Sequence, residues 1–164
     1  MTILLGKTQA VLDAAGLTYK TLDCDPSLAD TAAFCEHYNF LLSQSANAIL
    51  VAGKSAKTKF ACCIVLATTK LDVNKAVCKQ MGVKRASFAT GDQTKMLTGM
   101  EIGGVTPFGL PDDIPIYVDS AVMEQDEVVM GGGNRSSKVL LNPSELLKLP
   151  GVTIVDGLAR PKEL

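Results

Sequence analysis

The chain has 164 residues, of which 47% are hydrophobic and 20% are charged. This length and composition indicate a globular protein with a full core, and we expect one domain over residues 1–164. Sixteen Lys and Arg against 17 Asp and Glu leave a net charge of −1. A near-neutral chain is not a histone-like nucleic-acid binder, so DNA is not an expected partner. No apolar run is long enough for a membrane span, and a membrane is not expected either.

Histidine and cysteine usage limits the kinds of catalytic and metal site. His37 is the only histidine and is expected at the surface, and a multi-histidine metal centre is excluded. Five cysteines, an odd number without a CxxC pair, suit buried thiols in a reducing compartment. The start of the chain lacks a secretory signal, so a cytoplasmic location is expected. The thiols are Cys24, Cys35, Cys62, Cys63 and Cys78, and Cys62 and Cys63 would point to opposite faces of a strand.

Apolar periodicity and turn residues predict a mixture of helices and strands along the chain. Helices are expected over residues 3–15, 72–82 and 143–147. Two more are expected over residues 32–38, with Thr31 as the cap, and up to residue 97, with Asp92 as the cap. Strands are expected over residues 19–22, 48–52, 60–67, 83–89, 114–118, 128–130, 138–141 and 152–155. Residues 60–67 are almost continuously apolar, which indicates burial on both faces. The order is not a regular βαβ alternation, so we expect a mixed α+β fold: a mostly antiparallel, barrel-like mixed sheet flanked by helices.

Two glycine clusters, Gly103-Gly104 and Gly131-Gly132-Gly133, each lie beside a predicted strand. Consecutive glycines let a backbone approach a ligand closely, so one interpretation is a carbonyl-oxygen site made of backbone N–H groups. The segment of Thr106, Pro107 and Phe108 would then shape the wall of that site. The alternative is two tight turns or a bulge. Neither cluster has the spacing of a dinucleotide fingerprint or a P-loop.

Four segments together resemble a known family: residues 72–89, 97–109, 116–119 and 131–136. They begin with Asp72-Val73-Asn74-Lys75 and end with Gly131-Gly132-Gly133-Asn134-Arg135-Ser136. This ordered combination resembles the YbaK/prolyl-tRNA-synthetase-associated editing domain family, most clearly over residues 70–147. The resemblance implies a β-barrel-like mixed sheet flanked by helices. It also implies hydrolysis of the ester between a wrong amino acid and a tRNA, without a metal or a cofactor.

The resemblance also implies roles for particular residues. Gly103 and Gly104 would hold the carbonyl oxygen, and residues 131–133 would line the opposite wall, with water as the nucleophile. That role predicts that Gly131→Val abolishes turnover and leaves the fold intact. The acceptor end of an aminoacyl-tRNA would be the partner, and an aminoacyl-tRNA synthetase a further one. Arg135, between Asn134 and Ser136, would contact a tRNA phosphate; the alternative is an ion pair with Asp119 or Glu127.

The sequence departs from this family at its key lysine, whose position is occupied by Ala48, next to Asn47. Ala56-Lys57-Thr58 has the same residues as the Ala-Lys-Thr motif that carries this lysine in the family. It lies too close to Asp72 in the sequence, however, and we interpret Lys57 as a turn residue. Lys70 is a candidate to replace the lysine. Asp72 is either a ligand for a substrate hydroxyl or, our preference, a helix N-cap.

Three functional hypotheses follow. The first is a free-standing deacylase that clears mischarged tRNA, although a cysteine-clearing specificity is not supported because Gly131 replaces that branch's serine. The second, motivated by Ala48, is a catalytically silent module that binds a tRNA end or an aminoacyl-nucleotide. The third is a thiol enzyme that uses Cys24 or Cys78.

Overall fold

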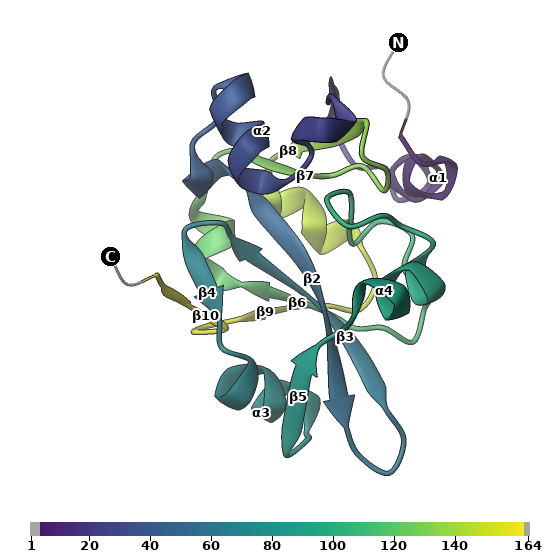
Figure 1. Ribbon diagram of the computed structural model, residues 1–164, viewed down its shortest axis with the longest axis vertical. Coiled ribbons are helices and arrows are strands. Elements are labelled where there is room, and N and C mark those ends of the chain that lie inside the picture. Colours follow the sequence, from purple (N-terminus) through teal and green to yellow (C-terminus); the bar gives the residue numbers. More distant parts are fainter. Residues whose placement is uncertain (1–3, 163–164) are drawn as a thin grey trace.

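The hairpin of β2 (Ala46–Lys54) and β3 (Lys59–Leu66) runs through the middle of the fold. The structure, a computed structural model, describes residues 4–162 (Figure 1). As the continuous apolar run predicted, β3 is buried on both faces. Cys62 belongs to the larger core cluster and its neighbour Cys63 to the cluster on the other face, so the two thiols do point apart.

The hairpin belongs to a five-stranded sheet of mixed direction, in the order β5-β2-β3-β6-β9. β5 (Arg85–Phe88) and β3 pair antiparallel with β2, whereas β6 (Ile116–Asp119) and β9 (Val152–Val155) continue the sheet in parallel. The expected mixed α+β fold, mostly antiparallel, is therefore confirmed. The barrel-like closure is not confirmed, because this sheet ends at β5 on one side and at β9 on the other.

A second, antiparallel sheet lies under helix α2 (Thr31–Tyr38) and has the order β1-β8-β7. Its strands are β1 (Lys20–Asp23), β8 (Ser137–Leu141) and β7 (Val128–Gly131). Phe34 and Cys35 of α2 are buried against Val129 and the partly buried Leu140. An isolated parallel bridge between Ser45 and Val129 joins this sheet to the start of β2. The two sheets thereby enclose a space beside β2, in which the candidate site lies.

The remaining elements surround these two sheets (Figure 1). They are α1 (Gly6–Ala14), α3 (Cys78–Met81), α4 (Gly91–Thr98), a π turn (Val73–Val77), and 3-10 helices at Pro26–Leu28, Leu42–Gln44, Ser120–Glu124 and Pro143–Lys148. A two-stranded sheet of β4 (Thr69–Leu71) and β10 (Ala159–Pro161) was not expected from the sequence. No helix within residues 4–162 is long and apolar enough to cross a membrane.

Several predicted helix boundaries are corrected. The first helix begins at Gly6, and residue 3, at which we expected it to begin, lies outside the described residues. The helix α4 begins at Gly91 rather than after residue 92, because Thr90 forms a capping box with Gln93. Residues 143–148 form a 3-10 helix in place of an α-helix, with Asn142 as the capping residue. Residues 72–82 divide into the π turn and α3.

Candidate functional site

A cavity of about 310 Å³ lies between β2, α2 and the first glycine loop. Its volume is at the lower end of the range for ligand sites in proteins. Asn47 and Ala48 line it from β2, and Gly103 and Gly131 line it from the two glycine clusters. The structure thus brings together four of the predicted site residues that are distant in sequence. Much of the remaining wall is apolar, and its residues include Phe34, Leu50, Phe88, Ile102, Val105, Val129 and Met130.

Lys138 of β8 also lines this cavity, and the sequence analysis missed it. The residue is only 6% exposed. Its Nζ donates to the carbonyl oxygens of Ala29 and Gly103, both at 2.7 Å, and lies 5.3 Å from the centre of the Phe34 ring. Burial lowers the pKa of this ammonium, although the Coulomb interaction with the Cys24 thiol acts in the opposite direction. A buried cation therefore holds the first glycine loop at the cavity wall.

Asn47 is held in place from α2. Its Oδ1 accepts a hydrogen bond of 2.8 Å from the Thr31 hydroxyl, which leaves the amide nitrogen for another partner. Both residues line the cavity. Asn47 therefore supplies a polar group on a wall that is otherwise rich in Ala, Ile and Leu.

The glycine clusters are needed because two backbone segments touch there. A Cβ at Gly104 would lie 2.2 Å from the Asn134 carbonyl oxygen, and a Cβ at Gly131 would lie 2.4 Å from that of Val105. The second cluster also packs on α1, since a Cβ at Gly133 would lie 2.6 Å from the Leu5 Cβ. The expectation that Gly131→Val leaves the fold intact is therefore wrong, because any side chain at this position meets main chain.

Two of the glycine N–H groups are already engaged. The Gly133 N–H donates to the Gly104 oxygen at 2.7 Å, and the Gly104 N–H donates to the Glu101 oxygen at 2.9 Å. The first bond joins the two clusters and the second closes a turn within the first loop, so neither N–H is directed at a ligand. The structure thus joins the two interpretations of the glycines: they form tight turns, and the turns bring Gly103 and Gly131 to the cavity.

Arg135 connects the second cluster to the first and to the segment before α2. Its Nε donates to the Pro26 oxygen at 3.1 Å and its NH1 donates to the Ile102 oxygen. NH1 also lies 3.4 Å from the Asp30 carboxylate. The ion pair that we considered therefore forms with Asp30, and not with Asp119 or Glu127.

The other predicted residues have structural positions. Asn134 Oδ1 accepts from the Ser136 N–H and hydroxyl, both at 3.1 Å, and so shapes the turn. Thr106 and Phe108 are fully buried, and Pro107 lines a different hollow. None of these residues, nor Gly104, Gly132, Gly133 or Arg135, lines the cavity.

Lys70 and Asp72 lie at the β4–β10 sheet, and neither lines the cavity. Lys70 is paired in register with Arg160, and Asp72 is 3.5 Å from the Arg160 guanidinium. The Asp72 side chain accepts a hydrogen bond of 3.3 Å from the Lys75 N–H, so the preferred N-cap interpretation is confirmed. Lys70 does not occupy the position that Ala48 leaves vacant.

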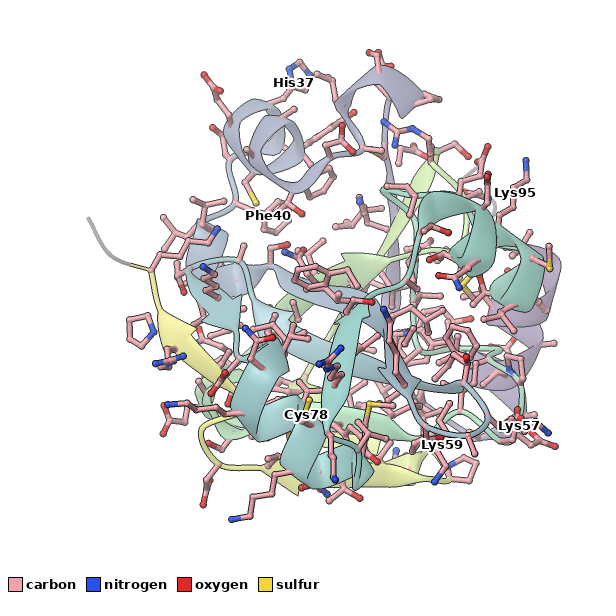
Figure 2. All side chains as sticks on the ribbon, turned by 60° about the horizontal axis from the view of Figure 1, so that its bottom comes forward. His37, Phe40, Lys57, Lys59, Cys78 and Lys95 are labelled. Atoms are coloured by element: carbon pink, nitrogen blue, oxygen red, sulfur yellow. The ribbon has the colours of Figure 1, made fainter. Side chains whose placement is uncertain are left out.

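The surface predictions for His37 and Lys57 are confirmed. His37 is exposed on α2, where Figure 2 shows it pointing away from the body of the protein. Lys57 is exposed in the loop between β2 and β3 (Figure 2). All five cysteines are buried free thiols, as expected, and none of them lines the cavity. Burial raises the pKa of the Cys24 thiol, the opposite of what a thiol nucleophile requires.

No three His, Cys, Asp or Glu side chains within residues 4–162 are grouped so that they could hold a metal ion. The polar groups at the cavity are thus hydroxyls, one amide, one ammonium, one carboxylate and main-chain groups. Such a set can bind and polarise a carbonyl group by hydrogen bonding.

Comparison with known proteins shows the family of this chain. Residues 25–149 match the family model of the aminoacyl-tRNA editing domain. The chain belongs to the aminoacyl-tRNA editing domain family. The matched region contains the whole cavity wall, from Asp30 to Lys138. Sequence similarity also extends to the uncharacterized protein YwhH of Bacillus subtilis (strain 168), with 38% identity over 77 residues. That match spans 47% of this chain and 48% of YwhH, about half the length of each.

Solved structures share the fold of this editing-domain protein. The hypothetical protein APE2540 superimposes with a TM-score of 0.84 at 21% identity, over 94% of this chain and 99% of that one. A candidate trans-editing enzyme for prolyl tRNA synthetase superimposes with a TM-score of 0.81 at 22% identity, over 98% of this chain and 100% of that one. At these identities the similarity shows the fold.

Proposed function

We propose that this protein hydrolyses the ester bond of a mischarged tRNA. The observation that carries the proposal is the cavity in which Gly103, Gly131 and the buried Lys138 meet, in a chain of the aminoacyl-tRNA editing domain family. Recognition of an aminoacyl ester needs hydrogen-bond donors at the carbonyl oxygen and a pocket for a small side chain. This cavity offers main-chain groups, the Asn47 amide and an apolar wall.

Hydrolysis of the ester by water needs few catalytic groups from side chains. A water oxygen bonds to the ester carbonyl carbon, the bond from that carbon to the ribose oxygen breaks, and a proton passes from the water to the ribose oxygen. One well-placed donor to the developing oxyanion is worth about 10²–10³ in rate. We assign the oxyanion to the backbone at Gly103 and Gly131, because the N–H groups of Gly104 and Gly133 are engaged elsewhere.

Lys138 supports this function in two ways. Its hydrogen bond to the Gly103 oxygen fixes the peptide that would bind the substrate. Its positive charge also lowers the energy of a negative charge that develops nearby in a site of low dielectric constant. One structural neighbour is described as a candidate trans-editing enzyme for prolyl tRNA synthetase. The acceptor end of a tRNA is therefore the substrate to test first, and a synthetase is the second partner to test.

The test is release of amino acid from a panel of correctly and wrongly charged tRNAs, with alanyl and seryl species included. Selective release of one amino acid is the expected result, and it would identify the substrate. No release from any species, by protein that is folded, would contradict the hydrolase. Saturable binding of the same tRNAs in that case would support the silent binding module that Ala48 first suggested.

A further inference from the structure

The edge of β2 that borders the cavity has a gap in its main-chain pairing. β5 pairs only with Val51–Lys54, and beyond it the Ala89 N–H donates to the Leu50 oxygen at 2.9 Å. At the other end, the Ser45–Val129 bridge joins β2 to β7. Between these two points, Ala48 lies at the middle of the gap and lines the cavity.

The direction of the Ala48 main-chain groups follows from the alternation of the strand. The N–H and C=O of one strand residue point to the same side, and successive residues point to opposite sides. The Ser45 oxygen accepts from Ala67, next to β3, whereas the Leu50 oxygen points away from β3 and accepts from Ala89. Even-numbered residues of β2 therefore direct their main-chain groups away from β3, and Ala48 directs its N–H and C=O into the cavity.

Neither group of Ala48 is bonded to another group within residues 4–162. An unpaired edge residue binds an extended ligand by completing the sheet, with an N–H that donates and a C=O that accepts. In an antiparallel pair, a hydrogen-bonded residue exchanges both bonds with the residue opposite, with Cα atoms about 5.5 Å apart. The ligand that completes such a pair has a donor and an acceptor on either side of one Cα.

An aminoacyl group has this arrangement, with an α-ammonium on one side of its Cα and a carbonyl oxygen on the other. We propose that Ala48 binds the aminoacyl group of the substrate as a single antiparallel pair. Its N–H donates to the ester carbonyl oxygen, and its C=O accepts from the α-ammonium. The inference rests on the proposed function, since it assigns the amino-acid end of that substrate to one strand residue.

Two consequences follow for the reaction. The Ala48 N–H is a further donor to the oxyanion, supplied by β2 and not by the glycine clusters that also line the cavity. Opposed residues in an antiparallel pair also place their side chains on the same face. The substrate side chain then lies on the face of β2 that carries Ala48 and Leu50. Ala48 binds the ammonium and carbonyl groups, which every aminoacyl group has. The apolar wall around the substrate side chain therefore determines which amino acid is accepted.

The test compares Ala48→Pro with Ala48→Val. Proline removes the N–H that points into the cavity but no bond to β3, and it is tolerated at strand edges. Valine adds similar bulk and keeps the N–H. We expect kcat/KM for amino-acid release to be roughly 10²-fold lower for Ala48→Pro than for Ala48→Val. The thermal midpoints of the two variants should agree. Equal kcat/KM in the two folded variants would overturn the proposal.

A second measurement uses wild-type protein and does not need turnover. The probes are three non-hydrolysable adenosines that carry alanine, serine or proline through a 3′ amide. Bound probe should slow hydrogen exchange at the Ala48 amide but not at the Ile49 amide, which faces β3. Unchanged exchange at Ala48 with every probe would overturn the proposal.

The two proposals can fail separately. Release of amino acid together with equal kcat/KM for the Pro and Val variants would overturn the Ala48 pairing and keep the hydrolase. No release from any tRNA, together with protection of the Ala48 amide by a probe, would overturn the hydrolase and support the pairing.

Discussion

The Lys138 ammonium donates to the Gly103 carbonyl oxygen across 2.7 Å and so ties β8 to the first glycine loop. The two residues are 35 positions apart in the chain. A second bond to the Ala29 oxygen ties the same ammonium to the segment before α2. One buried cation thus joins three of the segments that enclose the cavity.

Lys138→Met should lower kcat/KM for amino-acid release by tenfold or more. A hydrogen bond to a charged group contributes about 1.5–3 kcal/mol, and its loss frees the Gly103 peptide to move. Thermal stability alone is uninformative here, because methionine also removes the cost of burying a charge. The matched control is Lys20→Met, on the exposed end of the adjacent strand β1, which should keep full activity. Full activity in Lys138→Met would contradict a role for this residue.

The pH dependence of the free energy of unfolding should also reflect the lowered pKa of Lys138. Since the folded-state pKa lies below the unfolded value of 10.5, the unfolded chain binds more protons between these two values. The free energy of unfolding then rises with pH across that window through this group. Urea unfolding of wild type and Lys138→Met at pH 7 to 10.5 should show wild type gaining on the variant as pH rises. A constant difference would show that the pKa of Lys138 is not lowered.

The sequence predicted the parts of the fold that depend on local patterns. The apolar run of residues 60–67 gave a strand buried on both faces, and two glycine clusters led to one cavity. The three-residue strands β4 and β10 are too short to show any period. The parallel pairing of β3, β6 and β9 joins segments far apart in the chain, and no local pattern specifies it.

Lys138 was missed for a physical reason. Alternation along β8 places Lys138 and Leu140 on one face and Val139 and Leu141 on the other. A lysine in such a pattern is usually at the surface. It is buried here because α2 and the glycine loop cover its face, and both are distant in sequence. The shared face with Leu140 was the one available signal.

Gly104→Ala should lower the free energy of unfolding by about 1–3 kcal/mol, the usual cost of overpacking. The added Cβ would lie 2.2 Å from the Asn134 oxygen, which is main chain and cannot rotate away. Gly6→Ala is the matched control, because a Cβ there meets nothing within 4 Å. Urea unfolding measures both. Equal stability of the two variants would mean that the glycine loops do not approach each other as described.

Alkylation of the protein with iodoacetamide at pH 8 should be slow and should leave amino-acid release unchanged. All five thiols are buried, and burial raises the pKa of Cys63 to about 12 and also raises that of Cys24. Very little reactive thiolate is present at pH 8 as a result. The same reagent in denaturant should modify the thiols quickly, which is the control. Rapid loss of activity with one equivalent of label would instead support the thiol enzyme.

Arg135→Ala distinguishes a structural role from a phosphate contact. Three polar partners, from the Pro26, Ile102 and Asp30 segments, already surround the guanidinium. We therefore expect a loss of about 1–3 kcal/mol in unfolding free energy from the removed hydrogen bonds. Asp30→Asn should cost less than about 1 kcal/mol, since the Asp30 side chain is 72% exposed and such ion pairs are weak.

The salt dependence of tRNA binding decides between the two roles. Each phosphate contact contributes about 0.7–0.9 to the slope of log K against log salt concentration. If Arg135 is structural, Arg135→Ala keeps the wild-type slope, and its activity falls because the Ile102–Gly103 peptide is no longer held. A slope smaller by about 0.7–0.9, with unfolding free energy unchanged, would instead assign Arg135 to a phosphate. The cavity would then lie directly beside the path of the tRNA backbone.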